Sequence, residues 1–358
     1  MRVAVAGAGA FGRNHLRVLR ELEAAGSGVT LAAAVEPDAA RAAEVRGQYG
    51  IPVFASAGEM LTADQHLHAA CVAVPTVHHR AVAAALLDAG LDLLVEKPLA
   101  ATLEEADDLV ARAERAGRIL QPGHLERFNP AVLAIESRLR RPMFFEAHRL
   151  SVFTPRSLDV DVVLDLMIHD LDIVLTFAAS PVREVRAVGL PVVSPRVDIA
   201  NVRIEFESGC VANFTASRVS TEKVRKLRFF EPRQYVSIDY ARRDLLVIRM
   251  DAGTGNLPAS VAAALASGKV DPALLAELAA GNAAGPAPGL SFVKPEVAPG
   301  EPLRLEIESF LESVRTRRAP HVTAHQGRAA LALALEIQAA MAAHAQRAGL
   351  SDFFNPGA

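Results

Sequence analysis

The stretch Val3-Ala4-Val5-Ala6-Gly7-Ala8-Gly9-Ala10-Phe11-Gly12 decides the fold of the N-terminal part of this 358-residue chain. Its first four residues predict a short buried strand, and the leucines that follow at helical spacing predict a helix. A strand, a Gly-x-Gly-x-x-Gly turn and a helix in this order are typical of dinucleotide binding, because glycines allow a tight bend and a close approach to a pyrophosphate. The helix N-terminus adds N–H groups for the anion. We therefore expect cofactor contacts from Gly7, Gly9, Ala10, Phe11 and Gly12.

Strand and helix patterns continue to alternate as far as residue 122. Apolar strand runs and helical patterns take turns over residues 31–35, 38–49, 71–74, 82–87, 91–95, 102–117 and 119–121. Because strand–helix–strand units cross over with one hand, they predict a parallel sheet with helices on both faces. We therefore predict a doubly wound α/β Rossmann domain over residues 1–122.

Residues 123–358 show a different pattern, in which strands follow one another without helices between them. The strand candidates are residues 144–150, 185–188, 202–206, 211–215, 226–230, 235–238 and 245–248, and the helical patterns are 130–140, 162–177, 303–314 and 323–343. Consecutive strands predict a mostly antiparallel sheet in an α+β domain. Residues 251–289 are rich in Ala, Gly and Pro, and we predict a surface excursion with a short helical pair there.

The composition argues against several classes of protein. The formal net charge is -3 and the basic residues are scattered, so the sequence shows no basic patch of the kind that binds nucleic acids. No apolar stretch reaches the roughly 20 residues of a membrane span, and the first apolar run is too short for a signal core. Two cysteines, Cys71 and Cys210, cannot form a disulfide framework. We therefore expect a soluble cytoplasmic protein in which both cysteines are buried.

Glu36 stands at the end of the second predicted strand. An acidic side chain there accepts hydrogen bonds from a ribose diol and repels a 2′-phosphate, so it favours NAD over NADP. Arg41, one helical turn further on, is the counter-evidence, because its guanidinium could reach a phosphate. The alternative interpretation is a purely structural glycine turn with a solvated Glu36.

Lys97 belongs to the tripeptide Glu96-Lys97-Pro98, which ends the predicted strand 91–95. Ligands of an open parallel sheet bind outside the carboxyl ends of its strands, so Lys97 is predicted to lie where chemistry takes place. An ammonium there would stabilise the charge of a developing alkoxide. On this feature alone, a solvated surface lysine is an equal alternative.

Asp165, His169 and Asp172 are predicted to share one face of the helix 162–177, at positions i, i+4 and i+7. Acid and imidazole groups in so apolar a helix are costly unless they are used or paired. His169 is therefore a candidate general base that Asp165 orients. The alternatives are a salt-bridged structural helix and a metal chelated by His and Asp. We predict no metal, because no second cluster of ligands completes a shell.

In their order along the chain, these motifs resemble the glucose-fructose oxidoreductase and inositol dehydrogenase family (Gfo/Idh/MocA). The resemblance rests on the 7–12 turn, on Val74-Pro75-Thr76-Val77-His78-His79, on Glu96-Lys97-Pro98 and on the later Asp165, His169 and Asp172. It implies that Lys97 and His169 are the acid–base pair of a sugar dehydrogenase, with Asp165 in support. It also implies a cis peptide before Pro98 and a homodimer or homotetramer formed through the C-terminal sheet. The cofactor contacts that it adds are Pro75, Thr76, His79, Glu96, Lys97 and Gln121.

A narrower resemblance points to the branch that oxidises the 3-hydroxyl of UDP-N-acetylglucosamine ahead of an aminotransferase in lipid A biosynthesis. It rests on residues 123–130 (GHLERFNP), on residues 164–170 (LDLMIHD) and on Glu301-Pro302-Leu303. Substrate contacts are then expected from Lys97, Asp165 and His169, from His124, Arg127 and Asn129, and from Arg149 and Arg156. Guanidinium forks suit a diphosphate, although ordinary surface arginines are an equal alternative for the last two.

Two other functions fit parts of the pattern. A myo-inositol or free-sugar dehydrogenase of the same family would share every motif and differ only in its substrate contacts. A non-catalytic NAD-binding sensor would keep the glycine turn and Glu36 but would lose Lys97 and His169. The presence of both residues favours the enzyme.

Overall fold

The computed structural model describes residues 1–63, 66–136, 138–154, 160–250 and 290–350. They belong to two compact units, which we call the N-terminal unit (Met1–Phe128 with Gly300–Leu335) and the sheet unit (Asn129–Pro299 with Glu336–Ala358). This division differs from the single boundary that we predicted at residue 122. The chain returns to the N-terminal unit because helix α10 (Pro302–Thr316) buries Leu303, Ile307 and Phe310 in that unit's core.

The N-terminal unit is built on a six-stranded parallel sheet, as predicted. Its strand order is β3-β2-β1-β4-β5-β6, and each neighbouring pair is parallel. The order reverses beside β1, which is the switch point of a doubly wound sheet. The strands are β1 (Arg2–Ala6), β2 (Thr30–Val35), β3 (Val53–Phe54), β4 (Ala69–Val72), β5 (Asp92–Glu96) and β6 (Leu120–Gly123).

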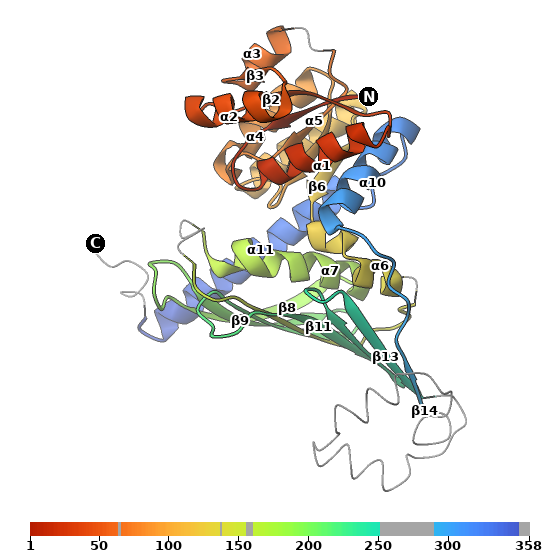
Figure 1. Cartoon of the computed structure of the whole chain (residues 1–358). Helices are drawn as coiled ribbons and strands as arrows, with labels where there is room; N and C mark the ends of the chain where they lie inside the picture. The colour runs from red at the N-terminus through yellow and green to blue at the C-terminus, as the bar shows by residue number, and fades with distance from the viewer. Residues whose placement is uncertain (64–65, 137, 155–159, 251–289, 351–358) are drawn as a thin grey trace, which may run out of the picture. The chain divides into compact units, whose positions relative to one another are not determined.

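Helices cover both faces of this sheet (Figure 1). On one face α1, α2 and α10 share a core with the strands, in which Leu16, Val45 and Phe310 are buried. Helices α4 and α5 pack against each other, and α4 also contacts the strands β4 and β5. The elements are α1 (Gly12–Ala24), α2 (Ala39–Tyr49), α3 (Ala57–Thr62), η1 (Thr76–His78), α4 (His79–Asp88), α5 (Leu103–Ala116) and η2 (Leu125–Phe128).

The ends of these helices follow the local sequence. Asp38 and Thr102 cap α2 and α5, because each side chain accepts a hydrogen bond from the backbone N–H three residues later. Gly50 and Gly117 end the same two helices in the left-handed conformation that glycine adopts without strain. These caps confirm the helices predicted over 38–49 and 102–117.

The sheet unit contains an eight-stranded sheet of order β14-β13-β12-β11-β7-β10-β9-β8. Every neighbouring pair is antiparallel except β7 and β10, which confirms the prediction of a mostly antiparallel sheet. Buried residues alternate with more exposed ones along most strands, as in a sheet with one covered face. The strands are β7 (Phe144–Leu150), β8 (Val182–Leu190), β9 (Ile199–Phe206), β10 (Val211–Ser217), β11 (Val224–Glu231), β12 (Gln234–Asp239), β13 (Asp244–Met250) and β14 (Leu290–Val293).

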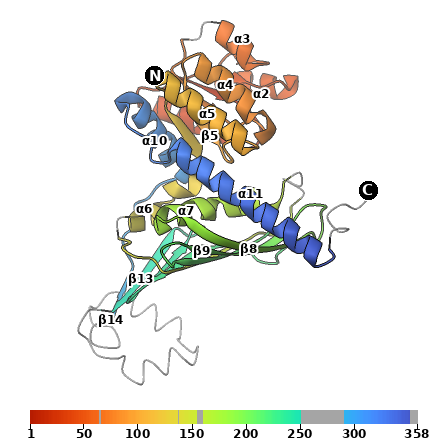
Figure 2. The same ribbon diagram turned by 180° about the vertical axis from the view of Figure 1, so that it is seen from behind.

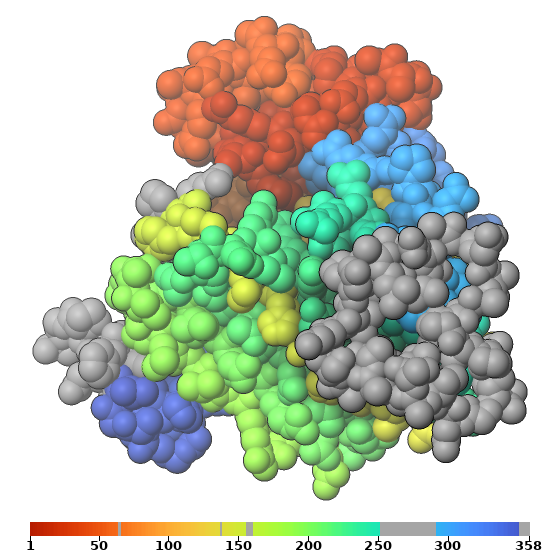
Figure 3. Space-filling view, turned by 60° about the horizontal axis from the view of Figure 1, so that its bottom comes forward, coloured from red at the N-terminus to blue at the C-terminus, as the bar shows by residue number. Residues whose placement is uncertain are grey.

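Helices lie on one face of this sheet in both ribbon views (Figures 1 and 2). They are α6 (Pro130–Glu136), α7 (Ile168–Ala178) and the second half of α11 (Ala324–Arg347), whose Met341 packs against Gly189 of β8. Phe145, Phe177 and Phe229 form the aromatic core between sheet and helices. Figure 3 is turned so that the opposite side of this sheet comes forward, where the green and teal strands form the surface.

Several elements differ from the prediction. The short β3, α3 and β14 were not predicted, and the helix expected over 130–140 ends at Glu136. The helix expected over 162–177 begins with a π-helical turn, η3 (Val163–Met167), before α7 continues it. The predicted excursion at 251–289 lies outside the described residues.

Candidate active site

The turn of residues 7–12 has the geometry that dinucleotide binding requires. Gly7 has a φ of +94°, and a Cβ there would lie 2.7 Å from the carbonyl oxygen of Ala73. A Cβ on Gly12 would lie 1.9 Å from the carbonyl oxygen of Gly7, so helix and strand pack too closely for any side chain. A Cβ on Gly9 would meet no atom within 4 Å, which leaves open space beside the backbone. These are the three separate roles that the motif gives its glycines.

The start of α1 is suited to an anion. Its N-cap residue Phe11 makes no side-chain capping hydrogen bond, and its first turn carries no acidic residue. The N-terminal N–H groups of a helix and its dipole then favour a negatively charged ligand such as a pyrophosphate. The residues present therefore fit a dinucleotide.

Glu36 lies directly after β2 and is only 4% exposed. Its carboxylate accepts hydrogen bonds from the backbone N–H of Ala8 at 3.0 Å and of Asp38 at 2.9 Å, which ties the end of β2 to the glycine turn. Arg41 lies 3.5 Å from Glu36 and 3.7 Å from Asp38. Because two carboxylates already neutralise Arg41, the site is built for a ribose diol rather than a 2′-phosphate.

Pro75, Thr76 and His79 lie beyond the carboxyl end of β4, at the start of η1 and α4. The buried His79 ring lies 2.9 Å from the carbonyl oxygens of both Val74 and Pro98, one at each nitrogen. Burial lowers the pKa of His79, so the neutral ring donates to one of these carbonyls. His79 therefore braces the segment after β4 against the segment after β5, while Pro75 is exposed and Thr76 is half-buried.

The Glu96-Lys97-Pro98 segment ends β5 at the same edge of the sheet. The Lys97–Pro98 peptide is cis, as the family resemblance implies. Lys97 is half-buried, while Glu96 is 8% exposed and its Oε1 lies 2.7 Å from Nε2 of His15. A Cβ on Gly123 of the neighbouring strand would lie 3.0 Å from Glu96 Cα, so β6 holds this segment closely.

Three predicted contacts near the end of β6 are buried within the N-terminal unit. Gln121 is fully buried and donates to the backbone carbonyl of Glu306 in α10 at 3.4 Å. His124 and Arg127 are 1% and 2% exposed. The Gln121 side chain therefore joins β6 to α10.

In the sheet unit, the π-helical turn η3 and helix α7 carry Asp165 and His169. Both side chains are half-buried, whereas Asp172 is only 1% exposed. The π turn contains Asp165 and ends before His169, whereas Asp172 follows His169 within the regular helix α7. Single π turns inside α-helices occur frequently at functional sites.

Asp161 fixes the beginning of this turn. Its Oδ1 accepts hydrogen bonds from the backbone N–H of Val163 at 3.0 Å and of Leu164 at 3.1 Å. Its Oδ2 accepts a third from Gln338 Nε2 of α11 at 2.5 Å. We did not predict this residue from the sequence, although an aspartate just before a helical pattern is a capping signal.

Arg149 has a different position from the one we predicted. It points inward from β7, is 3% exposed, and makes a two-pronged ion pair with Asp170 at 2.7 and 2.9 Å. Its guanidinium also lies 5.2 Å from the ring centroid of Tyr240. A guanidinium held on both prongs by a buried carboxylate is a structural group, so we no longer assign it to a diphosphate.

Asn129 is likewise engaged, since it caps α6 through Ala131 N–H at 3.2 Å and donates to the carbonyl of Tyr240 at 3.1 Å. Arg156 lies outside the described residues. No group of three or more possible metal ligands occurs in the part of the chain that the structure describes. Within that part, no helix is long and apolar enough to span a bilayer.

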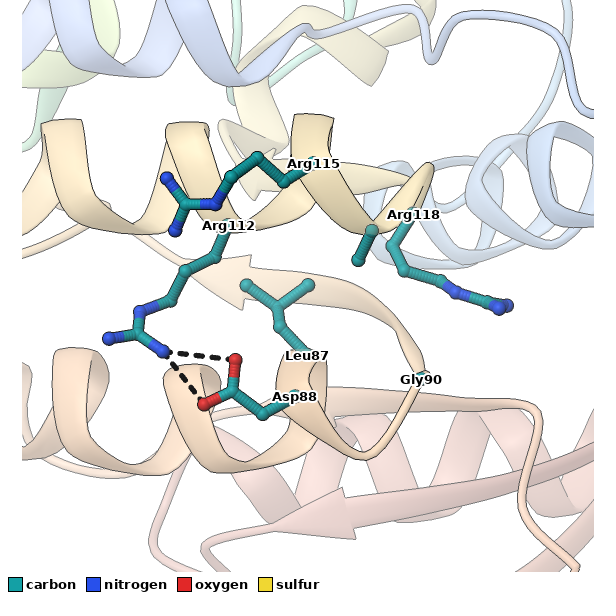
Figure 4. A pocket seen from close by; sticks show the side chains of 7 residues that line it. Leu87, Asp88, Gly90, Arg112, Arg115 and Arg118 are labelled. Atoms are coloured by element: carbon teal, nitrogen blue, oxygen red, sulfur yellow. Dashed lines mark hydrogen bonds and ion pairs between the residues drawn. The ribbon is translucent and has the colours of Figure 1, made fainter.

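A hollow of ≈ 330 Å³ lies at the other edge of the parallel sheet (Figure 4). It is lined by Leu87, Asp88, Gly90, Arg112, Arg115, Ala116 and Arg118. Gly90 and Arg118 precede β5 and β6, so this is the amino edge of the sheet, opposite to the glycine turn. Arg112 points to Asp88 and bonds both of its oxygens, at 2.7 and 2.9 Å. Its position at the amino edge argues against a dinucleotide site, because ligands of an open parallel sheet bind at the carboxyl edge.

Comparison with known proteins agrees with this geometry. Residues 1–124 match the GFO/IDH/MocA oxidoreductase family with its NAD-binding Rossmann fold, and residues 131–233 match the GFO/IDH/MocA C-terminal domain. UDP-N-acetylglucosamine 3-dehydrogenase from Acidithiobacillus ferrooxidans is 33% identical over 351 residues, covering 97% of this chain and 99% of that protein.

Two further proteins show how far the likeness extends. A solved structure of the Acidithiobacillus ferrooxidans enzyme superposes with a TM-score of 0.81 at 32% identity, over 96% of this chain and 98% of that one. An inositol 2-dehydrogenase from Leifsonia xyli is 32% identical over 52% of this chain and 56% of its own length. The glycine turn, the cis Lys97–Pro98 peptide and the full-length match lead to one conclusion: this chain is an NAD-dependent oxidoreductase of the GFO/IDH/MocA family.

Proposed function

We propose that this oxidoreductase converts the 3-hydroxyl of UDP-N-acetylglucosamine to a ketone, with NAD as its oxidant. The observation that carries the proposal is the extent of the match to the enzyme of that activity, 33% identity over 97% of the chain. The inositol dehydrogenase matches over only 52% of the chain. A likeness along the whole chain includes the sheet unit, which carries Asp165 and His169.

The N-terminal unit binds the cofactor in this proposal. The 7–12 turn and the N-terminus of α1 hold the pyrophosphate, and Glu36 accepts hydrogen bonds from a ribose diol. Pro75 and Thr76 contact the cofactor beyond β4, while His79 and Glu96 support that edge from inside. Bound NAD supplies the acceptor for the hydride that leaves the sugar carbon.

Three residues carry the chemistry. His169 accepts the proton of the hydroxyl as general base, and Asp165, one turn away, orients its ring. The Lys97 ammonium donates a hydrogen bond to the same oxygen and stabilises the negative charge that develops on it. One hydride and one proton leave the alcohol, so the products are the 3-keto nucleotide sugar, NADH and a proton.

The ketone suits a following amino transfer, which supports placing the enzyme in the synthesis of the 3-amino sugar of lipid A. Cys71 and Cys210 are buried and form no disulfide, which supports a reducing cytoplasm. A homodimer or homotetramer is supported by the uncovered face of the sheet unit. On that face Phe144, Phe230 and Tyr235 form a half-buried aromatic cluster with ring centroids 5.3 and 5.1 Å apart.

The proposal is tested by following NADH absorbance with UDP-N-acetylglucosamine, UDP-glucose, free N-acetylglucosamine and myo-inositol as substrates. We expect turnover with the first, and we expect reduction of the product with borodeuteride to place deuterium at carbon 3. Turnover with myo-inositol alone would leave the family intact but overturn the substrate. Tight NADH binding without turnover of any sugar would favour a sensor.

The assigned residues are tested by Lys97→Met and His169→Ala. Loss of a positioned acid–base group lowers kcat by about 10²- to 10⁴-fold. Lys294→Met and His325→Ala are the matched controls, since both residues form exposed surface pairs, with Asp244 and Glu114. A His169→Ala variant as fast as its control would show that another group is the base.

A further inference from the structure

His15 is a buried histidine that the proposed chemistry does not use. It lies in α1, three residues after the last glycine of the 7–12 turn, and its side chain is fully buried. Its Nε2 lies 2.7 Å from Glu96 Oε1, the residue before Lys97. The pair therefore joins two parts of the chain that are 81 residues apart, the dinucleotide turn and the segment that carries the reacting lysine.

The surroundings leave this pair little freedom. The ring of Phe11 covers the imidazole edge-on, with centroids 5.6 Å apart. On the other side, a Cβ on Gly123 would lie only 3.0 Å from Glu96 Oε2, so β6 closes over the carboxylate. A carboxylate in such a place is costly unless it has a hydrogen-bonded partner, and His15 is that partner.

The electrostatics indicate a charged pair. Burial disfavours the imidazolium, but the side chains of Cys71 and Glu96 outweigh it and raise the pKa of His15 to about 10. Two further titratable groups face the pair: the Cys71 side chain from β4 acts on His15, and His79 from α4 feels the charge of Glu96. The 2.7 Å contact and the raised pKa of His15 both place a proton between its Nε2 and the Glu96 carboxylate.

We propose that His15 is a positioning residue, which fixes Lys97 through the buried carboxylate of Glu96 and links its place to the dinucleotide turn. This inference rests on the proposed function in one respect, the role of Lys97. Lys97 directly follows Glu96 in the chain. The Lys97–Pro98 peptide is cis, and His79 braces it through the Pro98 carbonyl. His15 and His79 thus hold the two ends of the same tripeptide.

The first measurement is independent of any sugar. The pH midpoint of Lys97 acetylation, followed by trace labelling and mass spectrometry, reports the charge around its amine. In His15→Leu the Glu96 carboxylate is no longer neutralised, so we expect the midpoint to move to higher pH. In the double variant His15→Leu/Glu96→Gln the carboxylate is gone, and the midpoint is expected to return.

The second measurement uses turnover. We expect His15→Leu to lower kcat by about ten- to a hundredfold, the size of effect that a small misplacement of a reacting group produces, with little change in KM for the sugar. His15→Gln keeps a hydrogen-bond donor without the charge. Its kcat should lie between that of the unmodified protein and that of His15→Leu. NADH affinity, read from NADH fluorescence, should change little in either variant.

Leu16→Val is the matched control, because Leu16 is the next residue of α1 and is also fully buried, but it is apolar. A shift of the Lys97 midpoint in this control equal to that of His15→Leu would overturn the proposal, since packing alone would explain it. An unchanged midpoint in a folded His15→Leu would also overturn it. If the midpoint shifts as expected while no sugar is turned over, the positioning role stands and the proposed substrate fails.

Discussion

We expect Glu36 to decide which nicotinamide dinucleotide the turn accepts. Its carboxylate holds the glycine turn and neutralises Arg41. In Glu36→Gln the charge that repels a 2′-phosphate is lost and Arg41 loses one of its two acids. We expect the ratio of kcat/KM for NAD over NADP to fall at least about tenfold, or about 1.4 kcal/mol.

The control for this prediction is Asp38→Asn. It removes a carboxylate 3.7 Å from the same arginine, but it leaves Glu36 and the cap of α2 in place. We therefore expect a much smaller change in the ratio. Equal changes in the two variants would mean that net charge near Arg41, and not the position of Glu36, selects the cofactor.

Single residues also show where prediction from the sequence ends. The glycines and Glu36 were predictable because their roles depend on neighbours close in sequence, a strand before them and a helix after them. Arg149 was not, because its partner Asp170 lies on α7, 21 residues away, and only the folded sheet brings the two together. His15 was missed for the same reason, since Glu96 is its partner only across the sheet.

Among the elements, the π-helical turn η3 is held by its cap. Asp161 accepts three hydrogen bonds at the start of the turn that carries Asp165, and one of them comes from α11. We expect Asp161→Ala to lower the free energy of unfolding by about 1 kcal/mol, the usual cost of losing a cap. We also expect kcat to fall, because the turn positions Asp165 ahead of His169.

Ser56→Ala is the comparison for this element. Ser56 caps α3 through the Glu59 N–H at 3.2 Å, in a helix that carries none of the assigned residues. Urea unfolding should show a similar loss of stability in both variants, whereas kcat should fall only in Asp161→Ala. A full rate in Asp161→Ala would show that η3 keeps its geometry without the cap.

At this scale the strong patterns were predictable and the irregular ones were not. All seven strands predicted after residue 123 were found, because apolar runs of strand length follow one another there without helical patterns between them. The two-residue β3 is too short to produce such a pattern. The π turn interrupts an otherwise regular helical pattern, so the sequence predicted a plain helix over residues 162–177.

For the whole molecule, the uncovered face of the large sheet predicts self-association. Its aromatic cluster, formed by Phe144, Phe230 and Tyr235, lies on β7, β11 and β12. We expect a dimer or tetramer by size-exclusion chromatography with light scattering. Phe230→Glu should release smaller species, because a buried charge at the centre of an interface costs about 2 kcal/mol or more of association free energy.

Val192→Glu also replaces an apolar side chain with a carboxylate, but at an exposed loop position outside the sheet face. Val192 is 59% accessible. The assembly should survive this variant. Dissociation by both substitutions, or by neither, would place the interface elsewhere on the molecule.

The N-terminal unit is discontinuous in sequence, and this sets the order of events during synthesis. Its first 128 residues emerge early from the ribosome, but the face of the sheet that α10 covers has to wait for Leu303, Ile307 and Phe310. Domains made of one continuous segment can fold as soon as they emerge. Here the Rossmann sheet keeps part of its apolar surface open until residues 129–299 have been translated, so the nascent chain is exposed to aggregation during most of its synthesis.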